Sequence, residues 1–282
     1  MRWPTSPTRG GDGEPVSDAL LEIEDYSGAF CSETGELTPV LHAVSYRLET
    51  GVMTAVVGES GSGKSLVALS ILGIQPPAFE RSSGRILFRG VDLLDLDERA
   101  MRRIRGAEIS MVFQDARAAL NPVFTVGRQL ADVWQLQHGG GRRAAMRQAI
   151  EALGRVSIPE PERRARQYPH EFSGGMAQRA MIAMASLICQ PSLLILDEPT
   201  TGLDVTIQSD IMELIVELSR TRGLTTCLIT HDLGVVAETC QEVVVMNAGR
   251  VVETGSAEAI FTRPRDLYTQ RLLSASQLVE AA

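Results

Sequence analysis

Short apolar runs recur along the chain and alternate with segments whose apolar residues follow a helical period. Apolar runs bounded by turn residues predict buried strands of a sheet. The predicted strands are Leu20–Tyr26, Met53–Val57, Arg85–Phe88, Ile109–Phe113, Leu193–Leu196, Thr226–Ile229 and Val243–Met246. Because predicted helices lie between many of them, the chain is expected to adopt an α/β fold with a largely parallel sheet.

The middle of the chain differs in character from its flanks. Residues from about 121 to 171 show helical periodicity, contain many Arg residues and include three consecutive glycines. We interpret residues from about 115 to 172 as a small helical subdomain inserted into the core domain, which spans residues 20–262. Residues 1–19, rich in Pro, Gly and polar side chains, predict a disordered tail. Residues 263–282 form a short C-terminal extension, and Ser256–Leu278 predicts two short helices.

Composition narrows the possible functions. The chain has 282 residues, 44% of them hydrophobic, and a formal net charge of −8, whereas nucleic-acid binders usually carry a basic excess. The start has no apolar segment typical of a signal peptide. The longest apolar region, Ala180–Leu196, is interrupted by polar residues and Pro191, so it predicts a helix followed by a strand and not a membrane span. The four cysteines show no metal-like spacing and fit a reducing cytoplasm.

A glycine-rich loop follows the predicted strand Met53–Val57 and precedes an apolar helix. Its residues, Gly58-Glu59-Ser60-Gly61-Ser62-Gly63-Lys64-Ser65, fit the phosphate-binding pattern GxxxxGK[ST]. Glycines let the backbone turn its N–H groups toward phosphate oxygens, and the helix adds its positive N-terminal end. Lys64 is expected to reach the β- and γ-phosphates and Ser65 to coordinate Mg²⁺. A Gly/Ser turn that happens to contain a lysine is the alternative.

A second motif ends the apolar run Leu193–Leu196 with two carboxylates. Ligands of α/β sheets bind at the carboxyl ends of the strands, where Asp197 and Glu198 would stand. Asp197 is predicted to hold Mg²⁺, and Glu198 to accept a proton from an attacking water or to orient it. The alternative is that these acids merely begin the next helix as its N-cap.

The stretch Phe172-Ser173-Gly174-Gly175-Met176-Ala177-Gln178-Arg179 resembles the signature of ABC ATPases, usually written LSGGQ. By itself it also fits a simple helix cap, with Ser173 as N-cap. Together with the order of the other motifs, it identifies the chain as similar to ABC nucleotide-binding domains. The resemblance implies a P-loop fold with a RecA-like core, an antiparallel β subdomain and an inserted helical subdomain. It also implies two domains facing head to tail, with residues 173–175 of one contacting the γ-phosphate held by the other.

Four further positions match motifs of this family. Gln114 falls at the Q-loop glutamine, which would contact Mg²⁺, and His231 at the switch histidine, which contacts the γ-phosphate. Asp204 matches the loop that lies between the two sites. Phe30 matches the aromatic residue that stacks on adenine, although Tyr26 is close enough to compete. An isolated histidine is more often a capping or surface residue, and an isolated aromatic more often a core residue.

Finer sequence features resemble the oligopeptide and dipeptide importer branch. They include Phe113-Gln114-Asp115, Tyr168-Pro169-His170-Glu171 and Leu203-Asp204-Val205-Thr206-Ile207-Gln208. The branch implies a Mg²⁺-dependent ATPase at the cytoplasmic face of the cell membrane. Its expected partners are a second ATPase subunit in a heterodimer, two membrane-spanning permeases and an extracytoplasmic solute-binding protein. Membrane contact would occur only through the permeases, and no nucleic acid is expected.

Other functions remain as alternatives. The cargo could be nickel or another small solute, because Asp266-Leu267-Tyr268 replaces the usual His-Pro-Tyr of the branch. A soluble ABC ATPase acting on nucleic acid or ribosomes is a different class. Its members carry long coiled-coil insertions or two ATPase modules, and neither is visible in this sequence. A scaffold that binds ATP without hydrolysing it would be expected to lack Glu198 or His231, which are present here.

Overall fold

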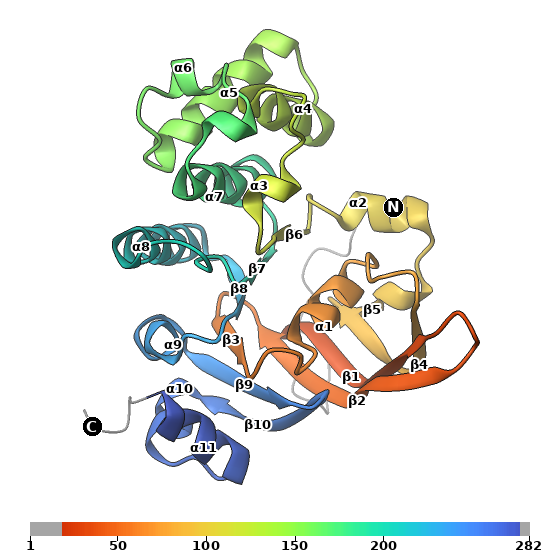
Figure 1. Ribbon diagram of the computed structural model, residues 1–282. Coiled ribbons are helices and arrows are strands. Elements are labelled where there is room, and N and C mark those ends of the chain that lie inside the picture. The colour runs from red at the N-terminus through yellow and green to blue at the C-terminus, as the bar shows by residue number, and fades with distance from the viewer. Residues whose placement is uncertain (1–18, 277–282) are drawn as a thin grey trace, which may run out of the picture.

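A computed structural model describes residues 19–276 of the chain. Figure 1 shows a body built on two sheets and, above it, a lobe of helices. The two sheets have six and four strands. The described part of the chain contains no helix with the length and apolarity needed to cross a bilayer.

The larger sheet has the strand order β10-β9-β3-β8-β7-β6, and neighbouring strands from β9 to β6 run parallel. Its four central strands consist almost wholly of buried residues, and their sequences are mainly apolar, as two covered faces require. Only the edge strand β10 pairs antiparallel within this sheet. The strands are β3 (Met53–Val57), β6 (Ile109–Val112), β7 (Leu193–Asp197), β8 (Thr225–Ile229), β9 (Glu242–Asn247) and β10 (Arg250–Ser256).

The smaller sheet is antiparallel, with the order β2-β1-β4-β5. Its two longest strands contain register shifts, and Asp25 and Ala43 adopt positive φ angles of 48° there. Bulges of this kind bend a strand and interrupt its alternation. The strands are β1 (Ala19–Cys31), β2 (Leu37–Glu49), β4 (Phe79–Phe88) and β5 (Val91–Asp92), followed by the 3₁₀ turn η1 (Leu93–Asp95) and α2 (Glu98–Ile104).

The helical lobe lies between β6 and β7 in the chain, near the position predicted for the inserted subdomain (Figure 1). It extends further than residue 172, because α7 packs against α3 and against the π-helical segment η3. The helix predicted at Met176–Cys189 starts two residues earlier, at Gly174, and changes to a π-helix after Ile182. The elements are α3 (Ala116–Ala119), α4 (Val126–His138), α5 (Arg142–Arg155), α6 (Pro161–Arg164), η2 (Pro169–Glu171), α7 (Gly174–Ile182) and η3 (Ala183–Ile188).

The remaining helices belong to the body. They are α1 (Lys64–Ile71), α8 (Val205–Arg222), α9 (Leu233–Thr239), α10 (Ala257–Thr262) and α11 (Leu267–Ala275). Side-chain caps set several starts: Asp232, Ser256 and Asp266 each accept a backbone N–H of the following turn, which satisfies an otherwise unpaired donor. The two short helices predicted for the C-terminal region are confirmed as far as residue 276. The predicted tail falls, apart from Ala19, outside the described residues.

Two apolar clusters cover opposite faces of the larger sheet. One contains Leu194, Leu196 and Leu228 and continues into the helical lobe; the other contains Ile195, Cys227 and Ile229 and continues into the antiparallel sheet. Alternate residues of a strand point to opposite faces, which explains this division. Burial raises the pKa of Cys227 to about 12, so this thiol packs as a small apolar group.

Candidate nucleotide site

The glycine-rich loop joins the end of β3 to the start of α1, as predicted. Gly58 adopts φ +147°, and a Cβ there would lie 2.0 Å from the Met246 carbonyl oxygen. Gly63, at φ +100°, precedes the first residue of α1, and a Cβ there would lie 2.6 Å from Leu41 Cδ2. The loop thus needs glycine for both conformation and space. Its tight curve and the start of α1 make a concave set of backbone donors that suits an anion.

Lys64 lies folded into this loop. Its Nζ donates to the carbonyl oxygens of Gly58 and Glu59 at 2.8 Å each and to Ser62 Oγ at 3.2 Å. The side chain is 6% exposed, and burial lowers the Lys64 pKa, opposed by the nearby carboxylates of Glu198 and Asp197. Three acceptors of the loop itself take the ammonium protons, so the positive charge is held within the loop.

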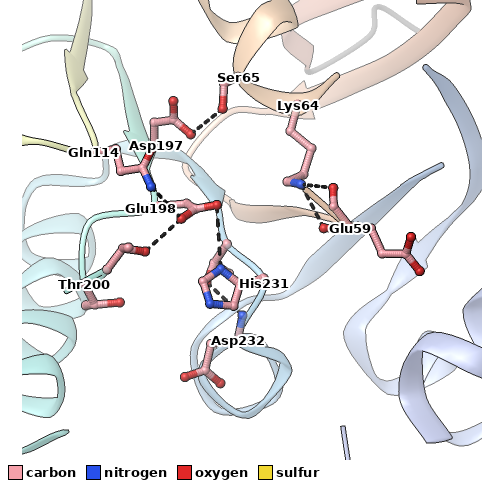
Figure 2. A network of polar contacts seen from close by, with 12 residues as sticks. Glu59, Lys64, Ser65, Gln114, Asp197, Glu198, Thr200, His231 and Asp232 are labelled. Carbon is pink, nitrogen blue, oxygen red and sulfur yellow. Dashed lines mark hydrogen bonds and ion pairs between the residues drawn. The ribbon is translucent and has the colours of Figure 1, made fainter. Parts of the chain in front are cut away.

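Ser65 and Asp197 connect the loop to β7. The Ser65 hydroxyl donates to Asp197 Oδ1 at 2.9 Å (Figure 2). Asp197 is 8% exposed, and burial raises its pKa; the Ser65 hydrogen bond opposes this shift, and Glu198 adds to it. A buried carboxylate whose ionised form is disfavoured is a ready partner for a cation.

Glu198 follows β7 in a left-handed conformation, with φ +46°. Such a backbone is unfavourable for a residue other than glycine and is held here by a hydrogen bond from Glu198 N to the Ile229 carbonyl at 2.8 Å. Glu198 Oε2 accepts Gln114 Nε2 at 3.1 Å and Thr201 Oγ1 at 2.8 Å. Glu198 therefore does not cap a helix: α8 begins only at Val205, with Asp204 as its N-cap.

His231 completes this group from the end of β8. Its Nδ1 lies 3.6 Å from Glu198 Oε1, and its side chain is 66% exposed. It is not the cap of α9, because Asp232 Oδ1 accepts the Val235 N–H at 3.1 Å and takes that role. Figure 2 shows Lys64 and Ser65 on one side of this site and Gln114, Glu198 and His231 on the other.

The signature residues do not join this cluster in the same chain. Ser173 is exposed and accepts the Met176 N–H at 3.2 Å, so it is the N-cap of α7 in the helical lobe. Gly174 is partly exposed, whereas Gly175 is buried. A Cβ on Gly175 would lie only 2.7 Å from Ile207 Cγ2, so a larger residue would not fit there. The exposed helix start can thus meet an anion brought by another molecule.

The remaining predicted residues lie around the cluster. Glu59, Ser60 and Gly61 form the exposed crest of the loop, and Asp204 is exposed beside the signature region. A hollow of about 530 Å³ is lined by the Gln114 segment, Gly174 and residues 201–203, so the Q-loop, the signature and the Asp204 loop meet there. Gln178, one turn into α7, also lines this hollow.

The aromatic candidates separate by burial. Tyr26 is 0% exposed within the core of the antiparallel sheet and cannot stack on a ligand. Phe30, at the far end of β1, is partly exposed and packs edge-on against Phe79 with ring centroids 5.7 Å apart. Of the two, Phe30 alone has a ring that an adenine could reach.

Sequence reasoning missed two contacts of this site. Thr201 holds Glu198, and the Glu59 N–H donates to the Tyr268 hydroxyl at 3.0 Å. Thr201 lies three residues after Glu198, so a turn in that segment could have suggested it. The segment around Tyr268 was noted for its resemblance to His-Pro-Tyr, but its contact with Glu59, 209 residues away, has no local sequence signal.

The donor set fits Mg²⁺ bound together with a phosphate group. Ser65 and Asp197 supply hard oxygen ligands side by side, and the Gln114 amide lies next to Glu198. Among residues 19–276, no three acidic, His or Cys side chains converge as a metal cage. Mg²⁺ bound here would take the rest of its ligands from phosphate oxygens and water, as it commonly does.

Comparisons with known proteins identify the family of the chain. A family model described as "ABC transporter" matches residues 41–201, more than half of the chain. A probable peptide ABC transporter ATP-binding protein of Sinorhizobium fredii is 50% identical over 261 residues, covering 92% of this chain and 77% of that protein. The dipeptide transport ATP-binding protein of Escherichia coli is 46% identical over 257 residues, covering 91% of this chain and 78% of that protein.

A solved structure extends the comparison to the fold. The dimeric post-hydrolysis state of an ATP-binding cassette bound to ADP and Pi superposes with a TM-score of 0.75. The match has 25% sequence identity and covers 84% of this chain and 99% of the other. The motifs, the fold and the relatives agree, and the chain belongs to the ABC transporter family as an ATP-binding ATPase subunit.

Proposed function

We propose that this ATPase energises an importer of oligopeptides or dipeptides. The proposal is supported by relatives named for peptide and dipeptide transport that align with more than nine-tenths of the chain at 46–50% identity. The observation that carries the energy-coupling part is the cluster in which Glu198 contacts Gln114, Thr201 and His231 beside the Lys64 loop. Import of nickel or another small solute is the second candidate, since nothing in the ATP site depends on the cargo.

In this proposal each residue of the cluster has a defined task. The backbone donors of Gly58–Ser65 and the Lys64 ammonium hold the triphosphate, with Phe30 against the adenine. Ser65, Asp197 and Gln114 hold Mg²⁺, which when bound offsets the negative charge of the phosphates. Glu198 accepts a proton from the attacking water or orients it, and His231 donates to the γ-phosphate. Apart from Phe30 on β1, these groups come from the four loops that follow β3, β6, β7 and β8, so catalysis is mainly positioning and charge stabilisation.

The second half of each site comes from another protomer. Ser173, Gly174 and Asp204 are exposed or partly exposed and have no role in the Lys64 cluster of their own chain. A partner's triphosphate would complete the start of α7 with the negative charge that a helix N-terminus favours. We propose a heterodimer with a second ATPase chain, in which ATP closes the pair and hydrolysis opens it.

The permeases would dock on a groove between the body and the helical lobe. The groove, of about 560 Å³, is lined by Ile74, Phe113, Val133 and Met184, together with the charged Arg105 and Asp132. Apolar grooves with a few polar groups commonly receive a partner helix. Phe113 directly precedes Gln114, so a permease segment in this groove would sense the state of the ATP site. The subunit would thereby reside at the cytoplasmic face of the membrane, with a solute-binding protein on the other side.

Reconstitution tests the proposed function. The chain is coexpressed with candidate permeases and a candidate second ATPase from the same organism, purified and placed in vesicles with a solute-binding protein. Uptake of labelled dipeptides and oligopeptides is then compared with uptake of Ni²⁺. ATP-dependent peptide uptake supports the proposal. Uptake of Ni²⁺ without uptake of peptides overturns the assignment of peptides as the cargo. Copurification with ribosomes or nucleic acid in place of permeases would overturn the importer role itself.

A further inference from the structure

Tyr268 contacts the nucleotide loop from the C-terminal end of the described chain. The Glu59 backbone N–H donates to the Tyr268 hydroxyl oxygen at 3.0 Å. The ring is partly buried and packs against the apolar cluster that fills the helical side of the larger sheet. Burial raises the Tyr268 pKa, so the hydroxyl remains neutral at physiological pH. The loop thus has a fixed partner outside the ATP-binding motifs, at the position where this chain keeps the Tyr of the branch's His-Pro-Tyr.

The same residue of the loop is held on its other side by Lys64. The Glu59 carbonyl accepts the Lys64 ammonium at 2.8 Å and the Ser62 N–H at 3.2 Å. The peptide groups before and after Glu59 are therefore both fixed, one by Tyr268 and the other by Lys64. The Gly58 carbonyl, which also accepts the Lys64 ammonium at 2.8 Å, lies in the same planar peptide as the Glu59 N–H, so a rotation of this peptide that broke the Tyr268 contact would also turn that carbonyl away from the ammonium. Tyr268 is in this way coupled to the position of Lys64.

Helix α11 is itself anchored to the sheet that carries the loop. The Glu253 carboxylate, on β10, accepts the N–H groups of Arg265 and Asp266 at 2.8 and 3.1 Å. Asp266 Oδ1 accepts the Tyr268 N–H at 2.7 Å and caps the helix. Strand β10 pairs with β9, which pairs with β3, the strand that ends in the loop. The C-terminal helix and the loop therefore share one rigid support.

We propose that Tyr268, which α11 holds against the loop, is a positioning residue of the nucleotide site. The hydroxyl accepts the Glu59 N–H and so keeps the Gly58 carbonyl of the same peptide directed at Lys64. A loop with left-handed residues at Gly58, Gly61 and Gly63 has many alternative conformations. Fixing one of its peptides beforehand reduces the ordering that ATP binding must supply. The proposal rests on the proposed function of this loop as the ATP site.

The first experiment measures Mg·ATP binding to the full-length chain with Tyr268→Phe. The ring and its packing remain, and only the acceptor of the Glu59 N–H is removed. We expect the Kd to rise roughly three- to tenfold, the effect of one lost hydrogen bond, and turnover at saturating ATP to be unchanged. Leu267→Ala, which shortens an exposed neighbour on the same helix, is the control and should bind as wild type. A Tyr268→Phe Kd within twofold of wild type overturns the proposal.

The second experiment measures the reactivity of the Lys64 amine in the absence of nucleotide. Lys64 is the only lysine in the sequence, so an amine reagent such as trinitrobenzenesulfonate has one side-chain target. The N-terminal amine serves as internal reference in a peptide map. We expect Lys64 to react severalfold faster in Tyr268→Phe than in wild type or Leu267→Ala, because its carbonyl partner is less fixed. Equal rates overturn the coupling. A faster rate in a chain that failed to bind ATP would uphold the coupling and reject the ATP role of the loop.

Discussion

The Ser65 hydroxyl donates to Asp197 Oδ1 at 2.9 Å, and this contact joins the first turn of α1 to the end of β7. Burial raises the Asp197 pKa even though the hydrogen bond and the Lys64 ammonium favour the ionised form. Without a cation, ionised Asp197 therefore reduces the stability of the fold. A site that is destabilised without its ligand gains more when the ligand binds.

Asp197→Asn should stabilise the chain in the absence of nucleotide. At neutral pH the variant removes an unfavourable buried charge, while its amide oxygen can still accept the Ser65 hydroxyl. Because the folded pKa is raised, the contribution of Asp197 to stability is fully present below the unfolded pKa and is lost as pH rises through the folded pKa. We expect the variant to melt a few degrees above wild type, with about 2 °C for each kcal/mol in a domain of this size.

Thermal unfolding between pH 4 and 8 checks this expectation. The difference between the variant and wild type should be largest at neutral pH and should shrink toward acid, where Asp197 becomes protonated. Mg·ATP should raise the melting temperature of wild type more than that of the variant. A variant that melts below wild type at pH 7.5 without nucleotide contradicts the assignment.

Glu198→Gln should abolish most hydrolysis and leave ATP binding intact. The side chain keeps its shape, and its amide oxygen can still accept the protons of Gln114 and Thr201, so the local structure should persist. What is lost is the ability to take a proton from water, an effect of about 100-fold or more. Steady-state phosphate release and Mg·ATP binding are measured on the same preparation. Turnover close to wild type would remove Glu198 from its role.

Thr201 should act on turnover through Glu198. Thr201→Val keeps the branched shape and removes the donor that lies 2.8 Å from Glu198 Oε2. We expect kcat to fall roughly three- to tenfold with little change in KM, as one lost hydrogen bond predicts. Thr201→Ser retains the hydroxyl and should recover most of the activity. If Val and Ser variants behave alike, the hydroxyl has no positioning role.

Much of this fold is readable from the sequence, and the exceptions have physical causes. Strands β3, β7, β8 and β9 are buried on both faces, so each contains a mainly apolar run that is easily recognised. The strand predicted at Leu20–Tyr26 is too short, because the bulge at Asp25 breaks the alternation and the observed strand continues to Cys31. The π-helical segment after Ile182 keeps a helical apolar pattern and gives no separate signal.

The candidate site, too, contains residues that the sequence predicts and contacts that it does not. Lys64, Ser65, Asp197 and Glu198 were found because loop chemistry and strand ends are local features. Their mutual contacts follow from the parallel sheet, which brings the carboxyl ends of β3 and β7 to one edge. The contact of Tyr268 with Glu59 depends instead on how the last helix packs across β10, and this packing has no local sequence pattern.

Two substitutions of Ser173 can show whether this residue only caps α7 or also binds the nucleotide of a partner. As a cap, Ser173→Ala should destabilise by about 1 kcal/mol, whereas Ser173→Gly should lose only a few tenths. If the hydroxyl also binds the partner's γ-phosphate, both variants should lower the ATPase activity of the assembled transporter roughly tenfold or more. Mg·ATP binding to the isolated chain should not change. Activity that follows the cap ranking, with Gly nearly normal, would leave Ser173 a purely structural residue.

Lys64 offers a direct test of the phosphate loop, because it is the single lysine of the chain. Burial lowers its pKa, so the neutral, reactive amine should appear at lower pH than for an exposed lysine, whose pKa is about 10.4. Labelling rates measured between pH 7 and 10 should show this shift. Mg·ATP should slow the labelling strongly, since phosphate oxygens would hold the ammonium in its charged form. Lys64→Arg, which has no lysine, should label only at its N-terminus. Labelling of Lys64 that Mg·ATP leaves unaffected would show that the triphosphate does not bind in this loop.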